Sequence, residues 1–168
     1  HRLFYHKGES SVKIKQLAKR KLKEFHRWCR VAVLHCDLIQ VDKDWMVTLF
    51  EYDPGDYKDR IYEWQREAPS EANEILKAIN EIPKPRHRAA LVMSYILPEK
   101  IQIKEQAQRL RIAESTYYLD KALALMEFAK RYRNGILDQD KSWWAEHRAW
   151  IVFLLFLNPI VTQNQNYF

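Results

Sequence analysis

The feature that most constrains this chain is a change of helical phase within "EQAQRLRIAESTYYLDKAL", residues 105–123. The apolar positions run through Ala107, Leu110 and Ile112, and then restart in a second phase at Tyr118, Ala122 and Leu125. Two short helices joined by a tight turn explain such a change, whereas one continuous helix does not. The stretch therefore predicts a bend near Arg111.

The rest of the sequence predicts an all-α fold, a helical bundle with a long basic N-terminal helix. Stretches with helical periodicity are separated by prolines, and the 168 residues include only 3 glycines, which disfavours a series of β-hairpins. A chain of this size can bury one core and carry an extension. We expect three parts: residues 1–55 with the basic helix and a connecting segment, 56–137 with a helical domain whose bent unit covers about 101–133, and 138–168 as a hydrophobic tail.

The N-terminal helix is expected to start at Ser10 and Ser11, which are good capping residues. Its apolar stripe would consist of Ile14, Leu17, Phe25, Trp28 and Ala32. Its other face carries the basic side chains Lys13, Lys15, Lys19, Arg20, Lys23 and Arg27. Further along, "DWMVTLFEYDPGD" predicts a short strand or an extended passage that ends in a turn, and Pro69 is expected to separate two helices.

Charge is distributed unevenly along the chain. Overall, 28 Lys and Arg stand against 22 Asp and Glu, a formal net charge of +6. Residues 1–34 contain ten basic and two acidic side chains, residues 37–81 contain five and twelve, and residues 99–133 contain eight and five. The two basic parts predict a polyanionic partner, although a solvated helical face explains the N-terminal run equally well.

Cys29 and Cys36 are the only cysteines. On one straight helix, a spacing of seven residues separates two Cα atoms by about 10 Å, which is too far for a disulfide. His26 and His35 lie nearby, but no CxxC pair is present to complete a tetrahedral zinc site. We therefore expect reduced, partly buried thiols in a cytoplasmic protein, and neither a metal nor a cofactor.

The bend at Arg111 has the composition of a helix-turn-helix. A small residue in the first helix lets the second helix cross closely, and Ala107 fills that place. Leu110 and Ile112 would flank the turn, and the inner face of the second helix would consist of Leu119, Ala122 and Leu123. The start of the second helix would then face base edges and phosphates in a major groove. A helical hairpin with a short turn would give the same pattern without reading DNA.

The expected DNA contacts fall into two groups. Those in the groove or at the turn are Arg111, Ser115, Thr116, Tyr117 and Lys121. Those that would clamp a phosphate at the start of the preceding helix are Arg86, His87 and Arg88. An ordinary surface histidine is an equally good interpretation of His87, and helical phase favours the core rather than a contact for Tyr118.

Two stretches, "PRHRAALVMSYI" and "EQAQRLRIAESTYYLDKALALMEFAKRY", resemble the ArpU family of phage transcriptional regulators. The C-terminal part of that family is similar to region 4 of sigma-70-type factors, a helix-turn-helix. The resemblance covers roughly residues 62–137. It implies a sequence-specific regulator that binds double-stranded DNA at phage late genes, for packaging or lysis, in the bacterial host cytoplasm at the nucleoid, with host RNA polymerase as a candidate partner.

Three positions depart from the pattern of the family. Arg111 stands where the turn usually has glycine, which costs about 1 kcal/mol in a left-handed conformation. Ala113 stands where a capping serine is expected, a loss of about 1 kcal/mol. Asp120 stands where a basic residue would face phosphate more naturally.

The C-terminal tail carries the apolar run "AWIVFLLFL" at residues 149–157. A helix needs about 20 apolar residues to span a bilayer, so this run is too short. A helix lying on the membrane surface is a minor alternative, because the run lacks a clear polar face, and we expect no membrane partner. The run would pack against the N-terminal helix or between two subunits, which allows a homodimer through that helix or through the tail.

The sequence lacks the motifs of the common enzyme classes, and we expect a protein that is not an enzyme. The sequence has no glycine-rich loop, nucleophile elbow or HExxH motif. Its acidic cluster of Asp53, Asp56 and Asp59 surrounds a turn and lacks the spacing of a calcium loop. Two functions remain: a sequence-specific DNA-binding regulator, or a helical protein-interaction adaptor that docks on host RNA polymerase or another phage protein without reading DNA.

Overall fold

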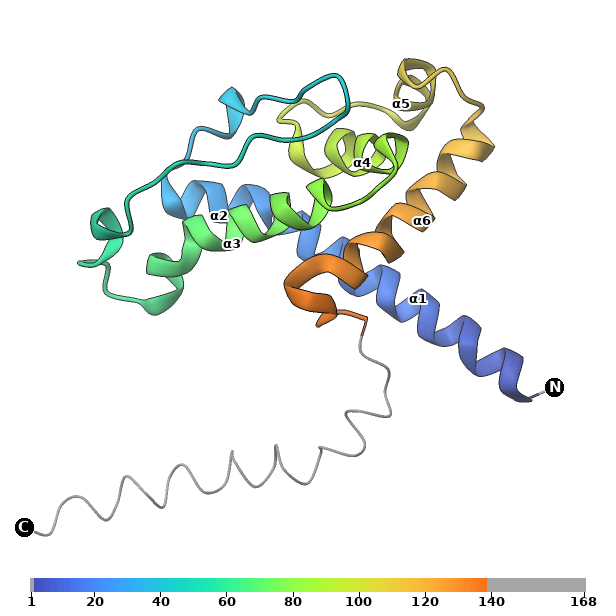
Figure 1. Ribbon diagram of the computed structural model, residues 1–168, viewed down its shortest axis with the longest axis horizontal. Coiled ribbons are helices and arrows are strands. Elements are labelled where there is room, and N and C mark those ends of the chain that lie inside the picture. Colours follow the sequence, from blue (N-terminus) through green and yellow to red (C-terminus); the bar gives the residue numbers. More distant parts are fainter. Residues whose placement is uncertain (1, 139–168) are drawn as a thin grey trace, which may run out of the picture. The chain divides into compact units, whose positions relative to one another are not determined.

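The computed structural model describes residues 2–138, with side chains from residue 10 onward, and these belong to one compact unit (Figure 1). Its α-helices are α1 (Arg2–Lys23), α2 (Phe25–Ala32), α3 (Glu63–Asn80), α4 (Pro85–Leu91), α5 (Ile103–Arg109) and α6 (Glu114–Arg131). Short helical turns cover Cys36–Leu38, Pro54–Tyr57, Val92–Ile96 and Tyr132–Gly135. The mainly helical character confirms the all-α prediction. The apolar run at 149–157 lies outside the described residues.

The helices α1 and α2 contribute one nearly continuous apolar stripe to the main core. Its buried members are Ile14, Ala18, Leu22, Phe25 and Cys29. The sequence placed Leu17 on this stripe, which is wrong, because steps of four residues from Ile14 lead to Ala18 and Leu22 and leave Leu17 exposed. Since α1 already begins at Arg2, the predicted start at Ser10 and Ser11 is also wrong.

The chain reverses direction directly after α2, and this turn overturns the prediction of reduced thiols. Val33 adopts a left-handed conformation with φ 56°. The amide of Leu34 donates to the carbonyl of Cys29 over 2.9 Å, which closes the end of the helix. Cys36 is thereby carried back to α2, and it forms a disulfide with Cys29 at a Cα–Cα distance of 6.3 Å. The assumption of one straight helix was the source of the error.

Two asparagines of α3 hold the extended passage that follows. Asn80 accepts from the amide of Val47 and donates to its carbonyl, both over 2.8 Å, and Asn73 makes the same pair of bonds to Phe50 over 2.9 Å. Seven residues of helix rise about 10.5 Å, and three residues of extended chain cover about 10 Å. The two distances match, so asparagines on one face of α3 can bond to the backbone of the extended passage at two points. The described part of that passage has one further strand-like pairing, the isolated bridge between Val41 and Val47.

The predicted break at Pro69 is wrong, because α3 runs through that residue. A proline inside a helix removes one backbone hydrogen bond. Burial supports the helix on both sides of this defect, since Ala68, Pro69, Ala72, Ile75 and Leu76 are all buried. Figure 1 shows α3 lying alongside α2, the helix against which it packs.

A second, smaller core joins α4, α5 and α6. It consists of Ala89, Ala90, Met93, Ile101, Ala107 and Tyr117, with Leu110 and Ile112 packed against it. The helix expected to start near Arg86 is present as α4, which the turn Val92–Ile96 continues. Among the described residues, no helix has both the length and the apolar character needed to cross a membrane.

Candidate functional site

The turn between α5 and α6 has the predicted bend at Arg111. Arg111 has φ 54°, and its amide donates to the carbonyl of Gln108 over 3.0 Å. The next amide, of Ile112, donates to the carbonyl of Ala107 over 3.1 Å. These two bonds form a Schellman motif, which normally has glycine at the left-handed position, and Ile112 packs against the small core that includes Ala107. The arginine therefore carries strain of about 1 kcal/mol.

Tyr117 fixes the rotation of α6 about its axis. Its side chain is fully buried, and its hydroxyl lies 3.2 Å from the hydroxyl of Ser94 and donates to the side-chain carbonyl of Gln106. Gln106 in turn donates to the carbonyl of Ile101 over 2.8 Å. This buried network holds the start of α6 against α5 and the turn at 92–96. The expectation that Tyr117 lies in a groove is wrong, because no part of its side chain reaches the surface.

The helix α6 is rotated about its own axis relative to the prediction, so different side chains are exposed on its surface. Tyr118 is 54% exposed, and Leu119 and Leu123 are exposed as well, so these three side chains are on the surface rather than in the core. Ser115 is exposed and Thr116 is half-buried. Together with the exposed Arg111, the side chains of Ser115, Tyr118 and Leu119 make up the surface at the front of α6, which we call the α6 front.

The predicted phosphate clamp at the start of α4 is used inside the protein. Arg88 is buried and donates to the carbonyl of Asp44 over 2.7 Å and to the carbonyl of Ile82 over 2.6 Å. His87 is also buried, with its Nε2 3.6 Å from a carboxylate oxygen of Asp120. Both residues are therefore wrong as DNA contacts.

Arg86 and Asp120 form an ion pair between α4 and α6. The guanidinium of Arg86 contacts both carboxylate oxygens of Asp120, one of them over 3.2 Å, and Asp120 is buried while Arg86 is half exposed. Asp120 therefore does not face phosphate, because it neutralises Arg86 internally. Burial lowers the pKa of the neighbouring His87 imidazole, although the negative charge of Asp120 opposes that shift.

Lys121 lies on the side of α6 that faces α1 rather than at its front. Its side chain is half-buried, and its Nζ lies 5.3 Å from the centre of the Tyr95 ring. Burial lowers the pKa of the Lys121 ammonium, and the nearby charges of Lys19 and Lys23 lower it further. The placement of Lys121 next to α1 was not predicted.

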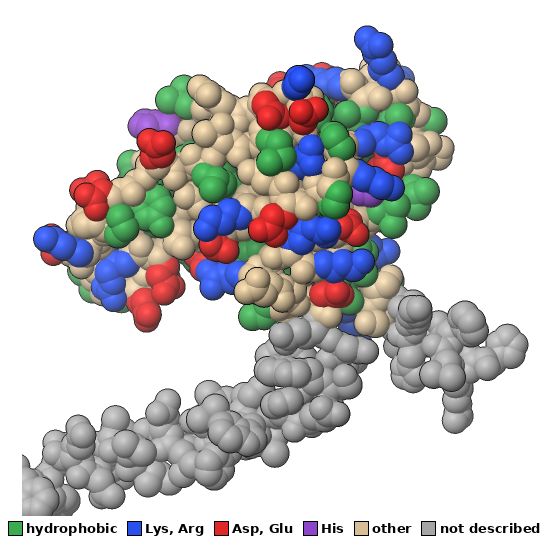
Figure 2. Space-filling view, viewed as in Figure 1, with side chains coloured by type: hydrophobic (Ala, Val, Ile, Leu, Met, Phe, Trp, Pro, Cys, Tyr) green, Lys and Arg blue, Asp and Glu red, His purple; other side chains and the backbone are tan. Residues whose placement is uncertain are grey.

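The charges around the α6 front are mixed. Arg109 is paired with Glu105 over 2.7 Å and with Glu99 over 3.4 Å, so it has little charge to offer a ligand. Figure 2 shows Lys and Arg side chains interspersed with Asp and Glu on one whole face of the molecule. On this face, a polyanion would be attracted by local groups of basic side chains rather than by one continuous basic patch.

Sequence reasoning placed Tyr118 in the core, and it did not connect Lys19 and Lys23 of the basic N-terminal helix with Lys121. The sequence did contain a pattern that indicates an exposed Tyr118. Tyr117, Ala124 and Phe128 are spaced so that they share one face of α6, and all three are buried, which leaves Tyr118 on another face. Leu119 and Leu123 form a second apolar stripe on the same helix, and the sequence analysis took this exposed stripe for the buried one. In the described part of the chain, no group of His, Cys, Asp and Glu side chains is arranged to hold a metal ion.

Part of the chain matches a family model. Residues 56–129 are similar to a family described as "Protein of unknown function (DUF1492)". The match includes α3, α4, α5 and most of α6, and with them the second core and the α6 front. No curated protein and no solved structure matches the chain.

Proposed function

We propose that this chain binds double-stranded DNA in a sequence-specific manner and regulates transcription. In this proposal α5, the turn at Arg111 and α6 act as a helix-turn-helix, with α6 as the recognition helix. The observation that carries the proposal is the position of Tyr117. Because this residue is locked in the core, the first turns of α6 present Ser115 and Tyr118 outward, next to the exposed Arg111.

The side chains at the α6 front suit contacts in a major groove. A serine hydroxyl can donate to a phosphate or bond to a base edge, and a tyrosine ring and a leucine can pack on a thymine methyl group. Arg111 at the turn would reach the phosphate backbone. Tyr118 thereby takes the role that the sequence assigned to Tyr117.

The finer part of the proposal comes from the resemblance to the ArpU family and to region 4 of sigma-70-type factors. It makes the protein a regulator of phage late genes that works beside host RNA polymerase at the nucleoid. The disulfide between Cys29 and Cys36 weighs against a cytoplasmic location, because disulfides are rare in that compartment. Trapping of free thiols in host cells tests the location directly: a location at the nucleoid requires that this disulfide be reduced there, so a persistent disulfide would contradict the location.

The DNA-binding proposal is tested by affinity measurements on sequences found by footprinting of the late region of the phage genome. The wild-type chain should prefer the footprinted duplex to a random one, and its affinity should fall steeply with salt. Ser115→Ala and Tyr118→Ala should each reduce this preference. Tyr62→Ala is a matched control, since Tyr62 is 57% exposed but lies at the start of α3. Equal behaviour of Tyr118→Ala and Tyr62→Ala would refute the proposal.

A second candidate function, the protein-interaction adaptor, is favoured by a different surface. Ile61 is 84% exposed, and the rings of Tyr62 and Trp64 are exposed and stack with centroids 5.9 Å apart. Exposed aromatic groups of this kind are typical of protein interfaces. If the chain is an adaptor, Tyr62→Ala and Trp64→Ala should abolish retention of purified host RNA polymerase, whereas Tyr118→Ala should not.

A further inference from the structure

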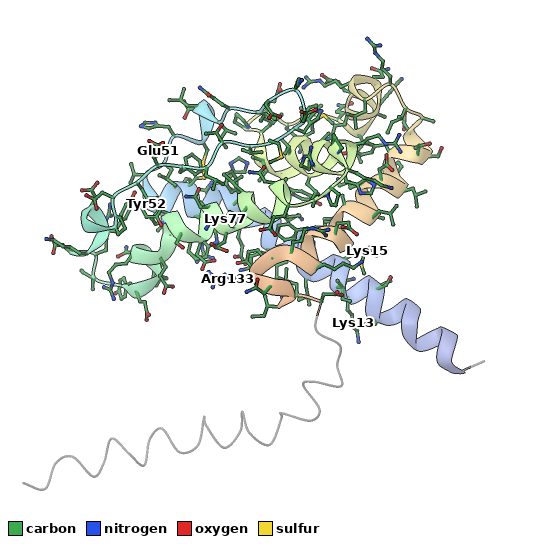
Figure 3. The ribbon with its side chains drawn as sticks, viewed as in Figure 1. Lys13, Lys15, Glu51, Tyr52, Lys77 and Arg133 are labelled. Atoms are coloured by element: carbon green, nitrogen blue, oxygen red, sulfur yellow. A yellow bond between two sulfur atoms is a disulfide. The ribbon has the colours of Figure 1, made fainter. Side chains whose placement is uncertain are left out.

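Lys19 and Lys23 of α1 and Lys121 of α6 belong to two helices that pack against each other. Lys15, Lys19 and Lys23 follow one another at intervals of four residues, so they form one row along α1. This row lies directly beside the buried stripe of Ile14, Ala18 and Leu22, through which α1 packs against the core that includes Ala124 and Phe128 of α6. Figure 3 labels Lys15 on α1, and Figure 1 shows α1 and α6 crossing. The charges of Lys19 and Lys23 act on Lys121 across this helix contact and lower the pKa of its ammonium.

The carboxylates of residues 10–138 do not neutralise the charges of Lys19, Lys23 and Lys121. Within residues 10–138, no carboxylate lies at ion-pair distance from Lys19, Lys23 or Lys121. The contrast with Lys21 is clear, since that residue is paired with Glu24 over 2.8 Å. A half-buried ammonium without a counter-ion is unfavourable, and the Tyr95 ring compensates for it only in part. The mutual repulsion of the three lysines adds to this cost and would be relieved by an anion.

We propose that Lys19, Lys23 and Lys121 form a binding site for the phosphate backbone of a DNA duplex. This inference rests on the proposed function and extends it, because it adds α1 to the surface that contacts DNA. Tyr118 and Lys121 are three residues apart, so they are neighbours on α6, with a rise of about 4.5 Å between them. A duplex whose major groove receives the α6 front would therefore bring a flanking strand toward the lysines, where the ammonium groups would hold phosphate oxygens.

Salt dependence of binding to a short labelled duplex of random sequence tests the site in the full chain. Each lost phosphate contact lowers the log–log slope by about 0.9, so Lys19→Gln with Lys23→Gln should lower it by about 1.8 and Lys121→Gln by about 0.9. The control is Arg20→Gln with Lys58→Gln, which removes the same charge from exposed positions outside the lysine group. Equal slopes for the Lys19–Lys23 variant and the control would overturn the site.

Protection of amines gives a second readout that does not depend on a variant folding normally. Bound duplex should slow amine-reactive labelling of Lys19, Lys23 and Lys121 but not of Lys58, as measured by peptide mass spectrometry. Equal labelling with and without duplex would overturn the site. Inorganic phosphate at the same phosphate concentration serves as a probe of the ligand, and protection equal to that by duplex would overturn the assignment to a DNA backbone.

The two proposals fail in different ways. Loss of the salt slope in the Lys19–Lys23 variant, with unchanged sequence preference in Ser115→Ala and Tyr118→Ala, would support the phosphate site and refute the readout by α6. An unchanged slope, with sequence preference lost in those two variants, would refute the phosphate site and support the recognition helix.

Discussion

Removal of a single hydroxyl at two adjacent tyrosines should give very different losses of stability. The hydroxyl of Tyr117 is fully buried and bonds to Ser94 and to Gln106, whereas Tyr118 is 54% exposed and makes no described hydrogen bond. Each bond of this kind contributes about 1 kcal/mol net, so Tyr117→Phe should lower the free energy of unfolding by about 2 kcal/mol. In Tyr117→Phe the Ser94 hydroxyl, 3.1 Å from the same Gln106 oxygen, is free to donate to it, so no further penalty for an unpaired acceptor is expected.

The assay is urea unfolding of the full chain, followed by circular dichroism, with Tyr118→Phe as the matched control. Tyr118→Phe makes the same chemical change one residue away and should shift the free energy by less than about 0.5 kcal/mol. Equal losses in the two variants, or a larger loss in Tyr118→Phe, would mean that α6 is rotated differently about its axis. The assignment of the α6 front would then be wrong.

Three further changes test other parts of the account. Asn80→Ala leaves the amide and carbonyl of the buried Val47 without partners and should cost about 3 kcal/mol in urea unfolding; a loss below about 1 kcal/mol would contradict the role of α3 in holding the extended passage. Val33→Gly should stabilise the protein by about 1 kcal/mol, because a β-branched residue with φ 56° is strained and its side chain is 69% exposed; a lower melting temperature would argue against this. Burial lowers the pKa of His87 below its ordinary value of 6.5, so the folded state favours the neutral imidazole. The contribution of His87 to stability is therefore complete above pH 6.5 and is lost as the pH falls below 6.5 toward the lower pKa of the folded state. His87→Gln should therefore reduce the loss of unfolding free energy between about pH 7 and pH 5, and an unchanged pH profile would show that His87 is not the group responsible.

The sequence predicted the bend at Arg111 because a change of helical phase is a local property of the apolar pattern. It also predicted the helical class, since prolines and helical periodicity define most elements. The rotation of α6 could not be settled in the same way. The helix is apolar along two stripes, one through Tyr117 and Phe128 and one through Leu119 and Leu123, and only packing against α4 and α5 determines which stripe is buried.

The disulfide and the hydrogen bonds of Arg88 inside the protein were not predicted either, because both depend on how distant or reversed segments of the chain pack. A left-handed valine at the end of a helix is uncommon, so nothing in the sequence indicated that the chain would return Cys36 to Cys29. Arg88 satisfies a carbonyl 44 residues away in the chain, at Asp44. Polar contacts between residues far apart in the chain produce no periodic pattern in the sequence. Arg88 was therefore predicted to contact phosphate, because it is a basic residue at the start of a helix.

The central claim is that α6 reads DNA through the face that carries Tyr118, and the ratio of affinities for a footprinted duplex and a random duplex tests it most directly. The account predicts that wild type prefers the footprinted duplex by at least about 10³-fold. Tyr118→Ala should lose about 1–3 kcal/mol of that preference while its unfolding free energy is unchanged. A wild-type chain that binds both duplexes equally, or a Tyr118→Ala variant that keeps the full preference, would contradict the account.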